Sequence, residues 1–369
     1  MKYSKKKVLV ALFLIAVLLC LSVSAVYASG KVTVSARAAV LYQPLTDTFL
    51  YTKNADAKLP MASTTKIMTA LVAIENGALD ERISADPRAV GTEGSSLYLK
   101  AGEIITMRDL IIGLMLRSAN DAAAAIAYAI SGDIAEFAEL MNERAASLGL
   151  QSTNFVNPHG LDDPNHYTTA RELAILAAEA MKNETFKEIV SLRKYVIKTS
   201  LEEPRIVINH NKLLTLYDSA IGVKTGFTKK SGRCLVGASE RDGLQFITVT
   251  INAPDDWNDH VSLFEYGYSV LESKVLARTG EFCYKLPVLD TDMSYLTVKN
   301  AEELRAILEK SHGEITHSVN LPRFLSAPVS QGDVIGTVTF KENGKFIAEL
   351  PLVAESSIPK QKKSIFSIF

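Results

Sequence analysis

The chain has 369 residues, of which 47% are hydrophobic and 22% are charged. This composition supports a sizeable buried core and excludes a disordered polypeptide, and the length is enough for two domains. Forty basic residues stand against 41 acidic ones, whereas nucleic-acid-binding proteins normally carry a basic excess. We therefore expect a globular protein that does not bind nucleic acid.

The first 28 residues have the pattern of a secretory signal peptide. Lysines precede an apolar run of 16 residues, from Val8 to Val23, and small residues follow as far as Ala28. A charged start, an apolar middle and a small-residue end are typical of export signals, and a spanning helix needs about 20 apolar residues. We expect cleavage after Ala28 and an exported protein that acts outside the cytoplasm.

Residues 29–274 are predicted to form one α+β domain. Alternating apolar residues from Val32 to Tyr51 indicate a pair of strands. Apolar residues at helical spacing predict helices over 61–75, 108–117, 121–130, 134–148, 168–183 and 260–271. Short apolar strands are predicted at 234–238 and 246–252, with a turn at 241–243 between them. Helices gathered against an antiparallel sheet make an α+β arrangement.

Residues 275–357 are predicted to form a separate small β domain. Asn343-Gly344 lies between two apolar stretches, and both residues tolerate the positive φ that a type I′ hairpin turn requires. Within this domain, residues 301–310 are predicted to form one short helix. The last residues, 358–369, combine lysines with isoleucines and phenylalanines. They predict either a frayed terminus or a tail that attaches to an anionic membrane surface.

The cysteines and histidines do not indicate a metal site. Cys234 and Cys283 follow the predicted signal peptide, and we interpret both as small buried hydrophobes, with a bridge between them left open. The six histidines form no His-x-x-x-His pair, and neither cysteine has a partner at zinc spacing. We expect neither a metal nor another cofactor.

A serine followed three positions later by a lysine is the first candidate catalytic pattern. On a helix both side chains lie on one face, where the lysine can take the proton of the attacking serine. The pattern begins at Ser4, Ser63, Ser191 and Ser357. Of these pairs, the one of Ser63 and Lys66 starts a strong apolar helix, whose N-terminus adds free N–H groups. Taken alone, Ser63 fits a helix cap better than a nucleophile.

Two further motifs follow in the chain. Ser118-Ala119-Asn120 lies between two predicted helices, and Lys224-Thr225-Gly226 occurs once, with Gly226 allowing close approach of a ligand to the backbone. Each motif alone is weak. In the order Ser-x-x-Lys, Ser-x-Asn and Lys-Thr-Gly, however, they form the element set of active-site serine penicillin-binding proteins and class A β-lactamases.

The flanking residues resemble those of low-molecular-mass penicillin-binding proteins. The resemblance is carried by residues 59–69, 94–99, 113–122 and 157–162. It covers about residues 32–273 and implies a serine-type D-alanyl-D-alanine carboxypeptidase. The implied fold is a β-lactamase/transpeptidase-like domain, in which a helical cluster packs on an antiparallel sheet, followed by a small all-β domain.

The resemblance also implies roles for individual residues. Ser63 attacks the carbonyl between the two terminal D-alanines of a peptidoglycan stem peptide, and Lys66 takes its proton. A free lysine has a pKa of about 10.4, so burial and the nearby cation of Lys224 must lower it. Ser118 relays a proton to the leaving amine, and Asn120 orients Lys66 and the substrate amide.

Substrate binding is assigned to Lys224, Thr225, Gly226 and Phe227. Lys224 and Thr225 suit the terminal carboxylate, and the N–H groups of Ser63 and Phe227 form the oxyanion hole. The chain departs from some relatives at two places. Phe227 stands where they carry histidine, and residues 255–260 lack the arginine that holds their substrate carboxylate.

Two alternatives remain at this level. A β-lactamase needs a carboxylate that activates the deacylating water, and Glu172 lies in the right stretch of chain. A catalytically silent protein that kept the fold would only bind peptidoglycan. For the carboxypeptidase, the resemblance implies peptidoglycan stem peptides as substrates and β-lactam antibiotics as inhibitors.

Overall fold

The computed structural model describes residues 32–201 and 203–360. The predicted signal peptide and residues 361–369 of the predicted tail lie outside these ranges. Residues 35–201 and 203–360 belong to one compact unit. Within it, residues 35–270 contain the three motifs, and residues 271–360 are almost entirely β-structure.

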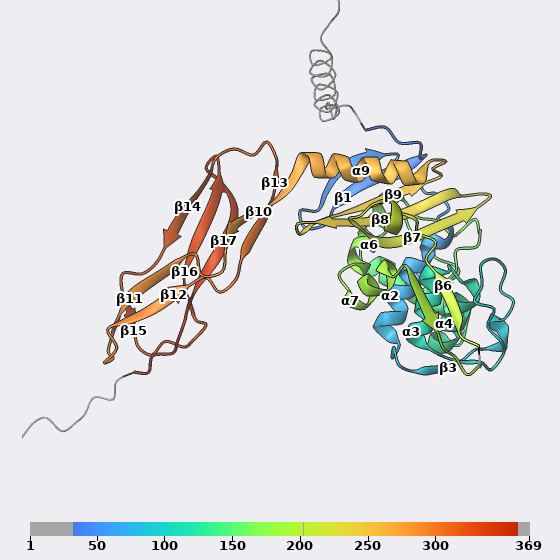
Figure 1. Ribbon diagram of the computed structural model, residues 1–369, viewed down its shortest axis with the longest axis horizontal. Helices are drawn as coiled ribbons and strands as arrows, with labels where there is room; N and C mark the ends of the chain where they lie inside the picture. Colours follow the sequence, from blue (N-terminus) through green and yellow to red (C-terminus); the bar gives the residue numbers. More distant parts are fainter. Residues whose placement is uncertain (1–31, 202, 361–369) are drawn as a thin grey trace, which may run out of the picture. The chain divides into compact units, whose positions relative to one another are not determined.

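A five-stranded antiparallel sheet organises residues 35–270 (Figure 1). Its strands lie in the order β2 (Thr48–Lys53), β1 (Ala38–Gln43), β9 (Leu244–Ile251), β8 (Gly232–Arg241) and β7 (Ala220–Thr228). The hairpin turn at 241–243 joins β8 to β9, as predicted. Strand β7 is an edge of the sheet, so one side of the Lys-Thr-Gly strand is open to a ligand.

Helices cover both faces of this sheet (Figure 1). Helix α9 (Asp256–Val270) packs on one face, where Gly237 of β8 meets His260. On the other face, Gly222 of β7 meets Val190 of α7 (Glu184–Ser191). The cluster on that side also contains α2 (Lys66–Asn76), α3 (Met107–Leu116), α4 (Asn120–Ser131), α5 (Ile134–Ser147) and α6 (Ala170–Ala180).

The predicted helices of this region are confirmed, with small shifts at their ends. The largest shift is at the first helix: residues 62–65 form a 3-10 turn, η1 (Ala62–Thr65), and α2 starts at Lys66. Thr169 caps α6 by accepting a hydrogen bond from the N–H of Glu172 at 3.1 Å. The short elements are η2 (Pro87–Ala89), α8 (Leu213–Leu216), the β3 (Arg82–Ser84) and β4 (Ile104–Thr106) pair, and the β5 (Lys194–Ile197) and β6 (Arg205–Ile208) pair.

Residues 271–360 form a separate set of strands with its own apolar core. Strand β10 (Leu271–Ala277) pairs with β13 (Leu304–Glu309), and the predicted boundary between residues 274 and 275 falls within β10. A six-stranded sheet has the order β14 (Ile315–Asn320), β16 (Val334–Glu342), β17 (Lys345–Ala354), β12 (Tyr295–Lys299), β11 (Cys283–Leu289) and β15 (Leu325–Ser326).

Two sequence-based expectations can be compared directly with this region. The hairpin at Asn343-Gly344 is confirmed, with φ of 48° and 82° joining β16 to β17. The helix predicted over 301–310 is wrong, because pairing with β10 makes 304–309 a strand. The buried side chain of Asn300 also bonds the Glu302 carbonyl at 2.8 Å, which fixes a loop before it.

The cysteine interpretation is half correct. Cys234 is buried in the core of the first region, as expected. Cys283 is exposed on β11, so its interpretation as a buried hydrophobe is wrong. Both thiols are free, and no bridge joins them. Ile358, with which the predicted tail begins, is buried in the apolar core of residues 271–360 and bridges Val329.

Candidate active site

Ser63 lies in the tight turn η1, directly before α2. Two threonine hydroxyls close this turn: Thr64 Oγ1 donates to the Met61 carbonyl at 2.6 Å, and Thr65 Oγ1 donates to the Ala62 carbonyl at 2.8 Å. The loop 157–160 presses on the turn, because a Cβ at Gly160 would lie 2.0 Å from the Ala62 oxygen. A glycine is therefore required there, and the nucleophile turn is held from two sides.

His166 extends this support. Its Nδ1 accepts a hydrogen bond from the N–H of Val156 at 3.1 Å, and its Nε2 lies 2.6 Å from Thr65 Oγ1. A neutral ring that accepts at Nδ1 carries its proton on Nε2 and donates from there. Burial is the main cause that lowers the pKa of His166 to about 4. The ring therefore stays neutral and donates to Thr65, which in turn donates to Ala62.

Lys66 is the first residue of α2, and its side chain is completely buried. Its Nζ lies 2.9 Å from Ser63 Oγ, 2.7 Å from Asn120 Oδ1 and 2.5 Å from the His159 carbonyl oxygen. These three acceptors saturate a protonated amine. When the amine is neutral it has two protons and one lone pair, so two contacts remain donor bonds and the third can reverse.

The electrostatics of the site favour the neutral amine. Burial is the largest cause that lowers the pKa of Lys66 well below its usual value, and the neighbouring cation of Lys224 lowers it further, against a smaller opposite effect from Asp121. Ser63 is the only one of the three partners that carries a hydroxyl proton. A neutral Lys66 can therefore accept the proton of Ser63, which is the arrangement that a serine nucleophile needs.

Ser118 and Asn120 come from the segment between α3 and α4. Ser118 is buried, lines the cavity beside Ser63 and has a φ of 61°, which residues other than glycine seldom adopt. Asn120 is the first residue of α4, and its Nδ2 donates to the Glu93 carbonyl at 2.5 Å. Because that bond fixes the amide, its Oδ1 faces Lys66.

Strand β7 brings the third motif to the nucleophile. Lys224 is buried and donates from Nζ to the Thr225 carbonyl at 2.8 Å, and burial lowers its pKa to about 7. A Cβ at Gly226 would lie 3.0 Å from the Ser63 nitrogen. The β7 backbone therefore lies directly against the nucleophile turn, and a side chain at residue 226 would separate them. Phe227 is 66% exposed at the rim.

These groups surround one cavity of about 480 Å³. It is lined by residues of all three motifs, namely Ser63, Ser118, Thr225, Gly226 and Phe227. Lys66, Asn120 and Lys224 lie behind this lining and are linked to it through hydrogen bonds or adjacent backbone. The structure thus brings together every site residue that was predicted from the sequence.

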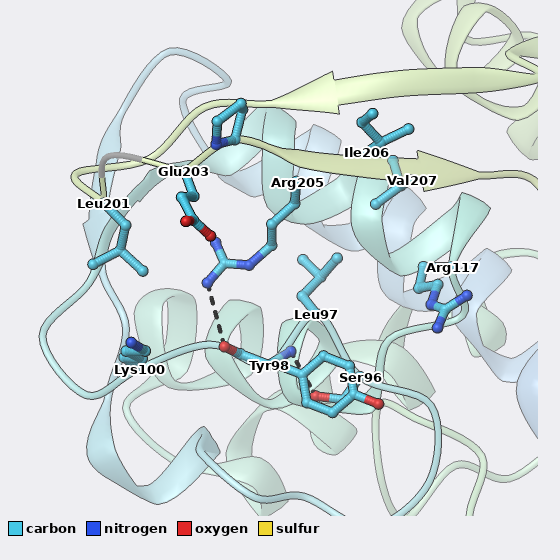
Figure 2. Close-up of a pocket in the computed structure, with 11 residues that line it drawn as sticks. Ser96, Leu97, Tyr98, Lys100, Arg117, Leu201, Glu203, Arg205, Ile206 and Val207 are labelled. Carbon is cyan, nitrogen blue, oxygen red and sulfur yellow. Dashed lines mark hydrogen bonds between the residues drawn. The ribbon is translucent and has the colours of Figure 1, made fainter.

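A second cavity, of about 710 Å³, lies next to the loop of residues 95–99, which also borders the first cavity (Figure 2). Ser95 lines the first cavity and Ser96 the second. Asp121 holds this loop, since its carboxylate accepts hydrogen bonds from Leu97 N–H, Leu99 N–H and Ser96 Oγ at 2.6–3.0 Å. Figure 2 shows Arg205 of the β5–β6 hairpin bonded to the Tyr98 carbonyl across the second cavity.

Sequence reasoning missed several residues of the site. Asp121 follows the Ser-x-Asn motif directly, and its acidic side chain at a helix start was a usable signal. His166 was considered only as a metal ligand. Arg233, Asp256 and Trp257 line the cavity with Ser63, but no motif includes them. For Arg233 the available signal is the hairpin register, which carries a residue of β8 back beside β7.

Comparisons with known proteins agree with this geometry. Residues 24–255 match the peptidase S11 family, described as D-alanyl-D-alanine carboxypeptidase, and residues 271–360 match the penicillin-binding protein 5 C-terminal domain. The chain is 30% identical to D-alanyl-D-alanine carboxypeptidase DacF of Bacillus subtilis over 337 residues, covering 88% of this chain and 86% of that protein.

Solved structures give the same result. Penicillin-binding protein 5 from Haemophilus influenzae superposes with a TM-score of 0.66 at 27% identity, covering 90% of this chain and 99% of that one. The Streptomyces K15 DD-transpeptidase has a TM-score of 0.63 at 34% identity, covering 65% of this chain and all of that one. The chain belongs to the peptidase S11 family of D-alanyl-D-alanine carboxypeptidases.

Proposed function

We propose that this protein is a serine D-alanyl-D-alanine carboxypeptidase that removes the terminal D-alanine from peptidoglycan stem pentapeptides. The observation that carries the proposal is the buried amine of Lys66, 2.9 Å from Ser63 Oγ, beside a cavity that all three motifs line. Penicillins acylate the same serine, because their strained amide presents a carbonyl to the same nucleophile.

The proposed reaction has two steps. In the first, Lys66 takes the proton of Ser63 as Oγ attacks the carbonyl between the two D-alanines. Ser118 passes a proton to the leaving amine, and D-alanine departs. In the second, water attacks the acyl-enzyme and releases the shortened peptide. The N–H groups of Ser63 and Phe227 stabilise the oxyanion in both steps, and such a donor is worth about 3 kcal/mol.

The decisive experiment measures D-alanine release from a stem pentapeptide. The wild type should release it, and Ser63→Ala should lose this activity. Ser191→Ala is the matched control, because Ser191 begins another Ser-x-x-Lys pattern but is exposed at the end of α7 and donates to the Glu188 carbonyl. Release of D-alanine by Ser63→Ala at the wild-type rate would refute the proposal.

Penicillin kinetics separate the alternatives. A fluorescent penicillin should label the wild type and not Ser63→Ala, and the acyl-enzyme should be long-lived. Rapid turnover would indicate a β-lactamase instead. That outcome is disfavoured by Glu172, whose carboxylate accepts hydrogen bonds from Ser152 N–H and Thr153 Oγ1. A wild type that is not labelled would indicate a catalytically silent peptidoglycan-binding protein.

We also propose that the chain is exported and that residues after Ile358 attach it to the membrane surface. Support comes from the sequence pattern of residues 1–28 and from the lysines and phenylalanines of the tail. Among residues 32–201 and 203–360, no helix is long and apolar enough to cross a bilayer. Deletion of residues 359–369 should move the protein from the membrane pellet to the soluble fraction; an unchanged pellet fraction would contradict the tail's role.

We further propose that residues 29–274 are the catalytic domain and residues 275–357 a separate domain. All predicted site residues lie in the first range, and the apolar core of residues 277–358 contains none of them. Expression of residues 29–274 alone should give a protein that fluorescent penicillin still labels at Ser63. Loss of labelling in a folded fragment would show that the second domain is required for the chemistry.

A further inference from the structure

The substrate of the proposed reaction ends in a carboxylate, and the site has to bind it. The family resemblance assigns this carboxylate to Lys224, but that residue is 1% exposed and its Nζ already donates to the Thr225 carbonyl. Burial lowers its pKa to about 7, so it is only partly charged at neutral pH. His210 also lines the cavity, and burial lowers its pKa below the usual value, which leaves it neutral.

Arg233 supplies a permanent charge in the same cavity. It lies on β8, directly opposite Phe227 of β7, while Thr225 is opposite Leu235. In an antiparallel pair, a residue two positions from the direct partner is a diagonal neighbour on the same face. Arg233 is therefore the diagonal neighbour of Thr225, and both line the cavity beside Ser63.

The guanidinium of Arg233 is held by residues at the start of α9. Its Nη2 donates to Asp256 Oδ1 at 2.6 Å, and Asp256 is almost fully buried at the start of α9. Its Cζ lies 5.5 Å from the centre of the Trp257 ring. The arginine side chain is nevertheless 43% exposed. A planar guanidinium held at one nitrogen keeps its other donors in a fixed orientation.

The donors of Arg233 are not used up within the protein. Nη2 is the one guanidinium nitrogen with a hydrogen-bond partner among the described residues, and the arginine side chain, which is partly exposed, lines the cavity. A carboxylate is the natural ligand, since a guanidinium presents two parallel N–H groups that match its two oxygens.

We propose that Arg233 binds the C-terminal carboxylate of the substrate, together with Thr225, and selects peptides that end in a free acid. The inference rests on the proposed function and extends it to substrate selection. It also explains how the chain works without an arginine in residues 255–260: that segment contributes Asp256 and Trp257, which position an arginine from the neighbouring strand. The carboxylate of a penicillin would occupy the same place.

The test compares two peptides that differ only at the C-terminus. One ends in D-Ala-D-Ala with a free carboxylate, and the other ends in the corresponding C-terminal amide. We expect the wild type to prefer the free acid in kcat/KM. Arg233→Gln should reduce kcat/KM for the free acid by about 10- to 100-fold and leave the amide nearly unchanged. If Arg233 had a merely structural role, the substitution would lower kcat/KM equally for both peptides and the enzyme would keep its preference for the free acid. That result would overturn the inference.

Two further variants serve as a control and as an alternative in case Arg233→Gln does not fold. Arg117→Gln, which removes an arginine of the second cavity, should leave the preference as it is. If Arg233→Gln fails to fold because Asp256 loses its partner, the double variant with Asp256→Asn removes both charges and should show the same loss of preference. A folded double variant that still prefers the free acid would overturn the inference. A wild type that releases D-alanine from neither peptide would instead contradict the proposed function itself.

Discussion

Residues 35–270 bury charged side chains, whereas residues 271–360 bury almost none. Lys66, Lys224 and Asp121 are each at most 1% exposed. Among the described residues from 271 onward, Asn300 is the one polar side chain of this kind. Its amide is fully used, because Oδ1 accepts from Phe282 N–H and Nδ2 donates to two carbonyls at 2.8 Å.

This difference in buried charge distinguishes the region that contains the active site from the region that does not. Burying a charge costs several kcal/mol unless the group is paired or neutralised. Burial lowers the pKa values of Lys66 and Lys224. A lysine needs a lowered pKa to act as a general base. Residues 271–360 are held by an apolar core and strand pairing, with no such cost. The catalytic function therefore maps to the region that tolerates buried charge.

The largest expected effect is the loss of the buried amine. Lys66→Met keeps a side chain of similar length but removes the amine that acts as the base. The second-order rate constant for acylation by a penicillin should therefore fall by about 100- to 10,000-fold. Stopped-flow fluorescence measures it. Lys194→Met is the control, because Lys194 completes the Ser191 pattern and is exposed on β5. Acylation of Lys66→Met within tenfold of the wild type would show that the buried amine is not the base.

Acid should destabilise the first region selectively. Burial is the main cause that lowers the pKa of His159 and His260 to about 3 and of His166 to about 4, against 6.5 in the unfolded chain. Below pH 6.5 the unfolded chain therefore binds protons that the folded chain does not, so stability is full above pH 6.5 and falls towards pH 4. Each histidine contributes up to about 1.4 kcal/mol per pH unit.

Trp257, the one tryptophan of the sequence, reports on this region. Urea unfolding followed by its fluorescence should show a free energy of unfolding that is about 4 kcal/mol lower at pH 5 than at pH 6. Proteolysis in urea, with the fragments identified by mass spectrometry, should show a smaller change in residues 271–360. If the stability of the two regions depended equally on pH, the buried histidines of residues 35–270 would not be the cause of the acid sensitivity.

A matched pair of ion pairs tests burial directly. Arg205 is bonded to both oxygens of Glu103, whose side chain is completely buried. Arg205→Ala leaves that carboxylate without its partner and should lower the free energy of unfolding by about 3 kcal/mol. Lys299 and Glu355 form an exposed pair in the other region. Lys299→Ala should leave the melting temperature unchanged. If the two substitutions lowered stability by similar amounts, burial of the carboxylate could not be the cause of the loss in Arg205→Ala.

The smallest expected effect comes from two glycines. Gly344 has a φ of 82° and open space where a Cβ would lie, so Gly344→Ala should cost about 1 kcal/mol in stability and leave D-alanine release unchanged. Gly226→Ala instead puts a Cβ 3.0 Å from the Ser63 nitrogen and should lower D-alanine release. Thermal unfolding and the activity assay read both variants. Normal activity in Gly226→Ala would show that β7 can move away from the nucleophile turn.

Local patterns predicted most of the elements. The helix periods and the Asn-Gly turn depend on neighbouring residues, and the structure confirms them. The prediction for residues 301–310 was wrong because Ala, Glu and Leu favour a helix intrinsically, while pairing with β10 depends on a strand about 30 residues earlier. Likewise, the exposure of Cys283 depends on which face of β11 it occupies.

The sequence by itself determined the motifs, their order and the residue types able to do the chemistry, because these are properties of short segments. Tertiary structure alone decided that Lys66 has no contact with water, that its amine meets Ser63, Asn120 and His159, and that Arg233 lies beside Thr225. The physical reason is that a pKa depends on burial and on charges brought in from distant segments. These surroundings exist only once the chain has folded.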